Sequence, residues 1–352
     1  MINFCAIDLF CGIGGLTKGL SLSGINVIAG FDIDSTCQFA YERNNSSKFY
    51  LMDIRKISGR DLVQLYPKKS IKILVGCAPC QPFSKYSIRY RSSRYKDDRW
   101  KLLNEFSRLI NDTLPHVVSM ENVPGLSRES IFKIFLKNLI DNKYSVDWKI
   151  VYCPKYGVPQ NRYRLVLLAS RMGKIELIPP LYDENHYPTV RQFIGNLPPL
   201  QAGEISEEDA LHRACKLSSI NLQRIRQSIP GGTWRDWEDA LKLKCHLRDT
   251  GKSYASIYGR MNWDEPSPTI TTQFYGYGNG RFGHPEQDRA ISLREGAILQ
   301  SFPKDYIFID SEHYSSRREL GIHIGNAVPV ELGRAIGLSI KKHIVTNTSK
   351  IT

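Results

Sequence analysis

The sequence predicts an α/β fold, in which a mostly parallel, doubly wound sheet is joined by a smaller inserted domain. Three observations lead to this prediction. Short apolar runs alternate with amphipathic stretches through the first half, turns and glycine become frequent after Ile178, and an apolar helical pattern returns at 322–342. We therefore expect a large domain formed by residues 1–190 and 305–352, and a small domain formed by residues 191–304.

The expected strands of the large domain are short apolar runs followed by helical segments. They lie at 4–9, 27–32, 48–53, 71–75 and 116–121, and a hairpin-like pair follows at 148–153 and 165–169. Helices are expected near 16–22, after Asp34, and at 102–110 and 131–139, where apolar residues recur at helical spacing. This alternation is typical of crossover connections between parallel strands.

Composition narrows the class of partner. The 352 residues carry a formal net charge of +13, which favours a polyanion such as nucleic acid. No apolar run is long enough to cross a bilayer, and the first residues do not resemble a signal peptide. Eight scattered cysteines then indicate reduced thiols in a cytoplasmic protein.

A glycine-rich turn is expected between the first strand and the first helix. Residues 8–15 read Asp-Leu-Phe-Cys-Gly-Ile-Gly-Gly, and glycines there let a ligand approach the backbone closely. Thr17 occupies the position of the third glycine in the dinucleotide fingerprint, which disfavours a nicotinamide site. Asp32 and Asp53, at the ends of the next two strands, are placed to bind a ribose and an adenine amino group. Together these features favour a nucleoside-containing cofactor.

The segment 73–84 contains Cys77-Ala-Pro-Cys80 directly after a strand, and three interpretations compete for it. A zinc site would need a second ligand pair, which the sequence lacks, so no metal is expected. A thioredoxin-like redox site fits locally but explains neither the chain's size nor its charge. The third interpretation is a nucleophilic Cys80, presented at the end of a central strand after Pro79.

Several further motifs occur along the chain in the same order as in a known protein family. They are Pro79-Cys80-Gln81, Glu121-Asn122-Val123, Gln160-Asn161-Arg162-Tyr163-Arg164, Arg289 to Pro303, and Gly325-Asn326-Ala327-Val328-Pro329. With the glycine turn, they resemble the C5-cytosine DNA methyltransferases of bacterial or phage restriction-modification systems. The resemblance runs from Ile7 to Pro329, which is nearly the whole chain.

The resemblance implies a Rossmann-like S-adenosylmethionine-dependent methyltransferase fold with an inserted target-recognition domain. The cofactor would be S-adenosyl-L-methionine, and the product S-adenosyl-L-homocysteine. The residues implied in cofactor binding are Phe10, Gly12, Gly14, Gly15, Asp32, Ile33, Asp53, Pro79 and Asn326.

The same resemblance assigns catalytic roles. Cys80 would add to carbon 6 of a cytosine, and Glu121 would act as the acid at ring nitrogen 3. Arg164 would reach the cytosine carbonyl oxygen, and Arg162 would support neighbouring groups or phosphate. Cys77 is then expected to be a packing residue.

Contacts with double-stranded DNA are expected from two regions. The segment 84–100 mixes cations with aromatic residues and resembles the family's mobile loop, which closes over a flipped base. The residues of this segment expected to contact DNA are Ser84, Lys85, Tyr86 and Arg89. In the recognition domain Gln273, Asn279 and Arg281 are candidates for base contacts, and a turn role for Asn279 stays equally open. Cations expected to position the DNA backbone are Lys216, Arg224, Arg226, Arg235, Arg248 and Lys252.

Two alternatives to DNA methylation stay open. One is the same chemistry on tRNA, which the full-sized insert disfavours. The other is a catalytically inactive DNA-binding regulator, which the presence of both Cys80 and Glu121 disfavours. We expect a monomer, whose cognate restriction endonuclease, if present, acts independently.

Overall fold

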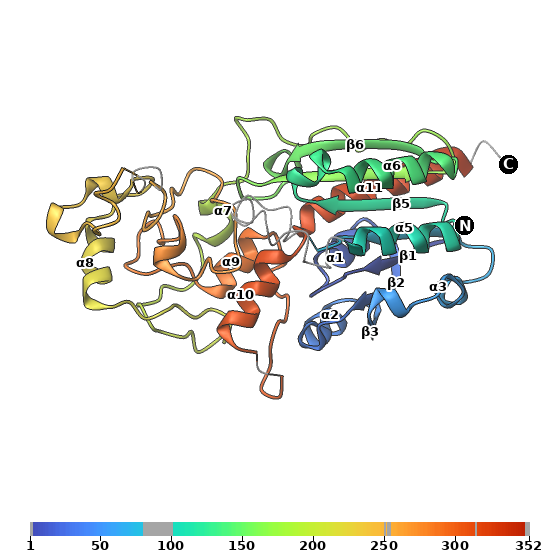
Figure 1. Ribbon diagram of the computed structural model, residues 1–352. Coiled ribbons are helices and arrows are strands. Elements are labelled where there is room, and N and C mark those ends of the chain that lie inside the picture. The colour runs from blue at the N-terminus through green and yellow to red at the C-terminus, as the bar shows by residue number, and fades with distance from the viewer. Residues whose placement is uncertain (1–2, 80–100, 250, 252–254, 314, 349–352) are drawn as a thin grey trace. The chain divides into compact units, whose positions relative to one another are not determined.

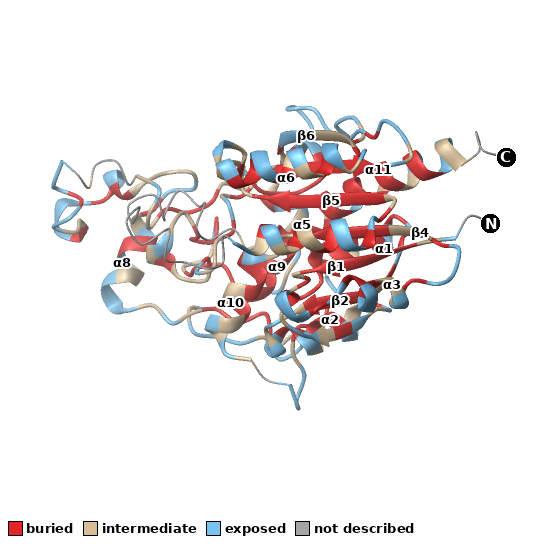
Figure 2. Ribbon diagram, turned by 45° about the vertical axis from the view of Figure 1, so that its right-hand side comes forward, coloured by how far each residue is buried: buried red, intermediate tan, exposed pale blue. Residues whose placement is uncertain are grey.

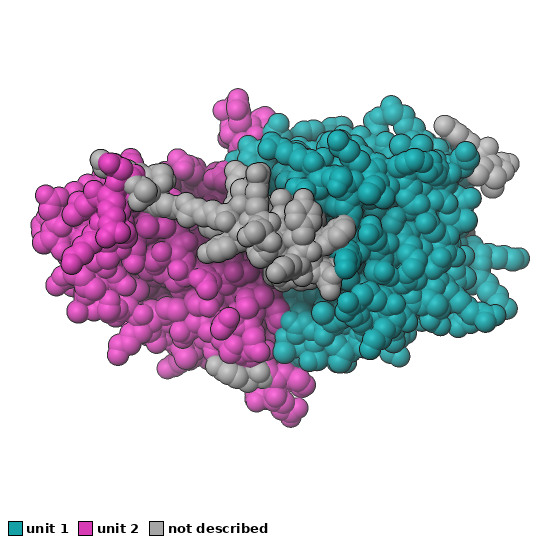
Figure 3. Space-filling view, in the orientation of Figure 1, with its two compact units in different colours: residues 1–156, 163–181, 328–352 teal, residues 157–162, 182–327 magenta. Residues whose placement is uncertain are grey.

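The computed structural model of the chain describes residues 3–79, 101–249, 251, 255–313 and 315–348. Its contacts divide the chain into two compact units (Figure 3). Unit 1 comprises Met1–Tyr156, Tyr163–Leu181 and Val328–Thr352, and unit 2 comprises Gly157–Arg162 and Tyr182–Ala327.

Unit 2 is larger than the small domain expected at 191–304, and two contacts explain the difference. The side-chain amide of Gln160 donates to the backbone oxygen of Leu299 at 2.9 Å, which ties 157–162 to this unit. Helix α10 (Arg317–Asn326) packs against α9 (Leu293–Leu299), so the chain stays in unit 2 beyond residue 304.

Unit 1 is built on a seven-stranded sheet with the order β3-β2-β1-β4-β5-β7-β6 (Figure 1). The strands are β1 (Phe4–Leu9), β2 (Asn26–Asp32), β3 (Lys48–Leu51), β4 (Ile71–Gly76), β5 (Val117–Asn122), β6 (Ser145–Tyr152) and β7 (Tyr163–Ser170). The pairs among β1 to β5 are parallel, whereas β7 runs antiparallel to both β5 and β6. The doubly wound sheet and the hairpin-like pair are thereby confirmed.

Helices cover both faces of this sheet. They are α1 (Gly15–Leu22), α2 (Gln38–Asn44), α3 (Gly59–Leu65), α5 (Leu102–Thr113), α6 (Ser130–Asp141) and α11 (Val330–Thr348). The chain moves from β1 to β2 in one direction along the sheet and from β4 to β5 in the other. Because crossovers are right-handed, α1 and α5 lie on opposite faces. Helix α11 packs closely on α1, where a Cβ on Gly19 would lie 2.4 Å from the Val330 oxygen.

The main core of unit 1 lies between the sheet and helices α3, α5 and α6. Every residue of β5 is buried (Figure 2), and residues 103, 106, 109 and 110 of the apolar stripe expected on α5 are buried as well, whereas Leu102 is half-buried. Ile134, an apolar residue of α6, is 61% exposed. Residues 131, 135 and 139 of that helix face the core instead.

The single helical pattern expected at 322–342 is two helices. Helix α10 ends at Asn326, and α11 begins at Val330. Pro329 separates them because proline lacks the backbone N–H that a continuous helix would use, and its ring disfavours helical geometry at the preceding residue.

Unit 2 has short helices joined by long connections. These helices include α7 (Val190–Ile194), α8 (Ser219–Gln227), α9 and α10. One of its apolar clusters is built from Ile225, Trp234, Trp237, Leu241, Tyr277 and Ala290. A buried ion pair of Arg289 with Glu295 supplements this packing. None of the helices in the described parts of either unit is both long and apolar enough to span a membrane.

Candidate active site

The carboxyl ends of β4 and β5 bring two predicted segments together. These strands are parallel, and Gly76 pairs with Met120 in their register. The next residue on each strand is therefore Cys77 and Glu121, and the Cys77 thiol donates a hydrogen bond to Oε2 of Glu121 at 2.9 Å. One residue further, the side-chain amide of Asn122 donates to the Ala78 oxygen at 2.9 Å. Two segments that lie far apart in the sequence are thus fixed side by side.

Glu121 is buried, and its second carboxylate oxygen meets a cation. Arg164 lies on β7, the antiparallel neighbour of β5, and its Nε is 2.7 Å from Glu121 Oε1. The exposed fractions of the two side chains are 12% for Arg164 and 3% for Glu121. This contact is an ion pair, and among the described residues Oε1 has no hydrogen-bond donor. The Nη1 of Arg164 donates to the Tyr163 oxygen at 2.8 Å.

Cys77, expected to be a packing residue, has a polar contact as well. Its side chain is only half-buried, and its thiol contacts the predicted acid. Pro79 is described and half-buried, whereas Cys80, Ser84, Lys85, Tyr86 and Arg89 lie outside the described residues.

The predicted cofactor turn has backbone geometry that favours glycine. Gly12 and Gly14 have φ angles of 49° and 85°, and Gly14 precedes the first residue of α1, Gly15. Phe10 has a φ of 62°, which is uncommon for a bulky residue and marks a strained position. The Gly12 N–H donates to Asp32 Oδ2 at 2.8 Å, so the acidic residue after β2 helps to hold the turn.

Asp8, on the strand before this turn, is buried, and Asp32, which holds the turn, is half-buried. Burial raises the pKa of Asp32, although the N–H groups of Asp34 and Gly12 oppose the shift. Burial also raises the pKa of Asp8 to about 7, against the hydrogen bond that it accepts from the Thr17 hydroxyl at 2.7 Å. Thr17 thus has a structural partner at the position where the dinucleotide fingerprint has glycine. Sequence reasoning missed Asp8 as an ionisable group, because a strand residue reads as core.

Apolar side chains remain exposed at the same edge of the sheet. Ile33, Leu51 and Met52 are 68%, 54% and 42% exposed, and they follow β2 or end β3. Leu51 is the register partner of Asp32, so the apolar side chains and the acidic residue share this edge. Of these apolar residues, only Ile33 was named from sequence. An apolar surface beside a glycine turn and a carboxylate fits the adenosyl part of S-adenosylmethionine.

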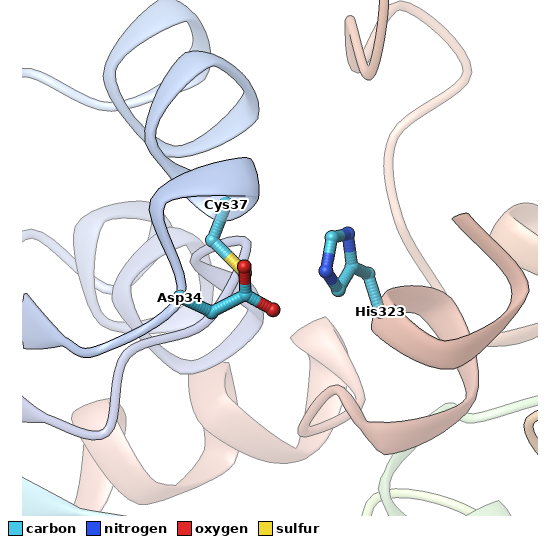
Figure 4. A group of neighbouring side chains, drawn as sticks. All are labelled: Asp34, Cys37 and His323. Carbon is cyan, nitrogen blue, oxygen red and sulfur yellow. The ribbon is translucent and has the colours of Figure 1, made fainter. Parts of the chain in front are cut away.

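Asp53, which is expected to bind the cofactor, also has a structural role. It caps the 3-10 helix η2 (Ile54–Lys56) by accepting from the Arg55 backbone N–H at 2.9 Å, so β3 ends before it at Leu51. The Arg55 guanidinium also binds its carboxylate and holds the pKa of Asp53 below its usual value. Asp34 plays a similar capping role for the 3-10 helix η1 (Ser35–Cys37), where Figure 4 shows Asp34 and Cys37.

The remaining predicted catalytic and cofactor residues belong to unit 2. Arg162 is buried, and its guanidinium donates to the oxygens of Ile270 at 2.9 Å and Gly325 at 3.2 Å. It thereby links three segments of that unit. Asn326 is the exposed last residue of α10.

The candidates for reading bases have distinct environments. Gln273 is exposed, while the Asn279 side-chain amide donates to the Gln273 backbone oxygen at 3.0 Å, which is a turn role. Arg281 is half-buried, and its side chain lies against the position that a Cβ on Gly259 would occupy. Arg224 was wrongly expected to position DNA. It is buried, donates to the Leu241 oxygen at 2.9 Å and lies over the ring of Trp237.

Comparison with known proteins supports the same class. The profile of C-5 cytosine-specific DNA methylases matches residues 4–342. The type II methylase M.HgiDII of Herpetosiphon aurantiacus is 51% identical over 341 residues, which cover 96% of this chain and 95% of that protein. The type II methyltransferase M1.BsuMI of Bacillus subtilis is 32% identical over 94% of this chain and 79% of its own length.

A solved structure supports the fold independently. It is that of a candidate DNA modification methyltransferase encoded within an Escherichia coli prophage. It superposes with a TM-score of 0.72 at 20% identity and covers 97% of this chain and 100% of its own. The chain therefore belongs to the C-5 cytosine-specific DNA methylase family. Its activity is that of a DNA (cytosine-5-)-methyltransferase, and the family uses S-adenosylmethionine.

Proposed function

We propose that the protein methylates carbon 5 of a cytosine that is flipped out of a specific duplex DNA sequence, through a covalent Cys80 adduct at carbon 6. The observation that carries this proposal is the placement of Glu121. It is a buried carboxylate at the carboxyl end of β5, beside the end of β4, and the chain leads from β4 through Pro79 to Cys80. A nucleophile and an acid are thus supplied by neighbouring strand ends.

The chemistry requires these two groups to act together. Carbon 5 is a poor nucleophile until the Cys80 thiolate adds to carbon 6, which breaks the ring's conjugation and moves electron density toward nitrogen 3. Glu121 must carry a proton, or share one with the base, at this step, and that proton at nitrogen 3 then balances the charge. Arg164 beside Glu121 supplies a fixed positive charge, with the cytosine carbonyl oxygen as its target. Once carbon 5 carries the methyl group, a water molecule would take the carbon-5 proton. Expulsion of Cys80 as a thiolate, with return of the nitrogen-3 proton to Glu121, would then restore the aromatic ring.

We place S-adenosylmethionine at the carboxyl edge of β1 to β3. When bound, it supplies an electrophilic methyl group. The cofactor would lie along the turn formed by Phe10, Gly12, Gly14 and Gly15. Asp32 would accept hydrogen bonds from its ribose hydroxyls, and Ile33 would cover its adenine. The exposed Leu51 and Met52 support an apolar contact there. Asp53, Pro79 and Asn326 complete the proposed set.

We assign DNA contacts to Ser84, Lys85, Tyr86 and Arg89 of the basic segment, and to Gln273 and Arg281 of unit 2. Asn279 is proposed to shape the recognition turn, because its amide is engaged with the Gln273 backbone. The net charge of +13 supports a polyanionic partner. We further propose that the protein acts as a cytoplasmic monomer, alongside a restriction endonuclease that reads the same short target.

Trapping on duplex DNA that contains 5-fluorocytosine tests the covalent step, because fluorine at carbon 5 prevents release of the thiolate. We expect a covalent complex with the unaltered protein and none with Cys80→Ala. Cys245→Ala removes an exposed thiol of unit 2 and should leave trapping intact. A complex with Cys80→Ala, or none with the unaltered protein, would overturn the proposal, and the latter result would favour a DNA-binding regulator.

Labelled methyl transfer to duplex DNA and to tRNA, measured in parallel, tests the substrate. We expect transfer to duplex DNA, and bisulfite sequencing of DNA from expressing cells should find one methylated sequence. A strong preference for tRNA would overturn this part of the proposal.

A further inference from the structure

We propose that Cys77 is a positioning residue for Glu121, so that a second cysteine serves the methylation reaction without forming a bond to the base. This inference depends on the proposed role of Glu121 as the acid. It goes beyond that role because it assigns a function to the first cysteine of the Cys-Ala-Pro-Cys segment, which the covalent mechanism does not use.

The sheet itself sets up the contact. Residues of β4 pair with residues of β5 that lie 44 positions later, as in the pair Gly76 and Met120. The same offset continues past the paired ends to Cys77 and Glu121, and then to Ala78 and Asn122. The hydrogen bond between Asn122 and Ala78 holds the end of β5 against the segment after β4, one residue beyond the thiol. Cys77 therefore has little freedom to move away from Glu121.

Glu121 is held from both sides. Arg164 contacts Oε1 at 2.7 Å from β7, and the Cys77 thiol donates to Oε2 at 2.9 Å from the direction of β4. Among the described residues, that thiol is the donor that reaches Oε2. Two contacts on opposite oxygens fix the plane of the carboxyl group, whereas Arg164 alone would let it rotate. A fixed plane matters because proton transfer depends strongly on hydrogen-bond direction.

A purely structural role explains the contact less well. Glu121 is 3% exposed, so a carboxylate oxygen that loses its donor there would be poorly solvated. Cys77 itself is half-buried and does not belong to the main core cluster of unit 1. Replacing it by alanine should therefore disturb Glu121 more than it disturbs packing.

Two substitutions at Cys77 test whether its side chain must donate a hydrogen bond to Glu121. Cys77→Ala removes the donor, and Cys77→Ser keeps one. Single-turnover methyl transfer from labelled S-adenosylmethionine to unmethylated bacteriophage DNA should be about 10- to 100-fold slower for Cys77→Ala, and within about 3-fold of the unaltered rate for Cys77→Ser. Cys245→Ala, a thiol loss in unit 2, is the matched control and should not change the rate.

A double-variant comparison shows whether Cys77 acts through Glu121. Glu121→Gln should be slow by itself, and adding Cys77→Ala should slow it little further, because the same function has already been lost. The pH dependence of the single-turnover rate should also change in Cys77→Ala and be restored in Cys77→Ser. The affinity for S-adenosylmethionine, measured calorimetrically, should stay the same in both variants and so shows that they are folded.

The outcomes are distinguishable. If Glu121→Gln keeps the full rate, the proposed acid is wrong. If Glu121→Gln is slow but Cys77→Ala is as fast as the unaltered protein, only the positioning role fails. Multiplicative losses in the double variant, or an equal loss in Cys77→Ser and Cys77→Ala, would also overturn it.

Discussion

The buried ion pair of unit 2 gives a prediction with a defined size. Arg289 and Glu295 are 0% and 1% exposed, and their side chains form two hydrogen bonds of 2.7 Å each. The Ser292 N–H donates to the same carboxylate at 2.6 Å. Burial disfavours the charge on Glu295, but its contacts with Arg289 outweigh that effect and lower its pKa to about 2.

Glu295→Gln keeps the shape of the side chain and removes its charge. The guanidinium of Arg289 would then be buried without a compensating anion, which costs about 3 to 5 kcal/mol of unfolding free energy. Replacing both residues, as Arg289→Met with Glu295→Leu, removes both charges and should destabilise unit 2 less than the single change does. The exposed pair of Arg191 with Asp264 is a control, because Arg191→Ala should change stability little.

Urea titration followed by tryptophan fluorescence measures these effects. Trp234, Trp237 and Trp263 lie in unit 2, so their emission reports on the affected unit. A Glu295→Gln variant whose unfolding free energy lies within about 1 kcal/mol of the unaltered protein would refute the reasoning. So would a double variant less stable than the single one.

Two further predictions concern unit 1. The pKa of Asp8 is about 7 when folded and 3.8 ordinarily, so the folded state binds more protons between these values. Stability should fall by about 4 kcal/mol as pH rises from about 4 to about 7, and urea titrations of Asp8→Asn across this range should lack that loss. A parallel decline in both proteins would contradict the assignment. Gly19→Ala should destabilise unit 1 by about 1 to 3 kcal/mol in thermal unfolding, because its Cβ would meet α11, whereas the exposed Ser21→Ala should not.

The sequence predicted the sheet well because each strand is a short apolar run with a local signal. It predicted the glycine turn and Glu121 because their residue types stand out at strand ends. It missed the contact of Cys77 with Glu121, since residues 44 positions apart become neighbours only through the register of β4 and β5. Arg224 was misjudged for a related reason: a cation in a polar stretch reads as exposed until aromatic rings are seen to cover it.

The boundaries of unit 2 could not be found from local patterns. They depend on contacts such as that between Gln160 and Leu299, which are 139 positions apart. The break between α10 and α11 did have a local signal, because Pro329 itself disfavours a continuous helix. The helical pattern of apolar residues on both sides of Pro329 concealed that signal.

The contact between Gln160 and Leu299 has a consequence for protein synthesis and for engineering. The chain passes between the units after residues 156, 162, 181 and 327, so neither unit is one continuous segment. Gln160 leaves the ribosome well before Leu299 has been made, and unit 2 cannot complete its packing until nearly the whole chain is available. A chimera that exchanges residues 182–327 with a relative would also need that relative's 157–162. Without that short segment, the grafted unit would lack part of its own interior.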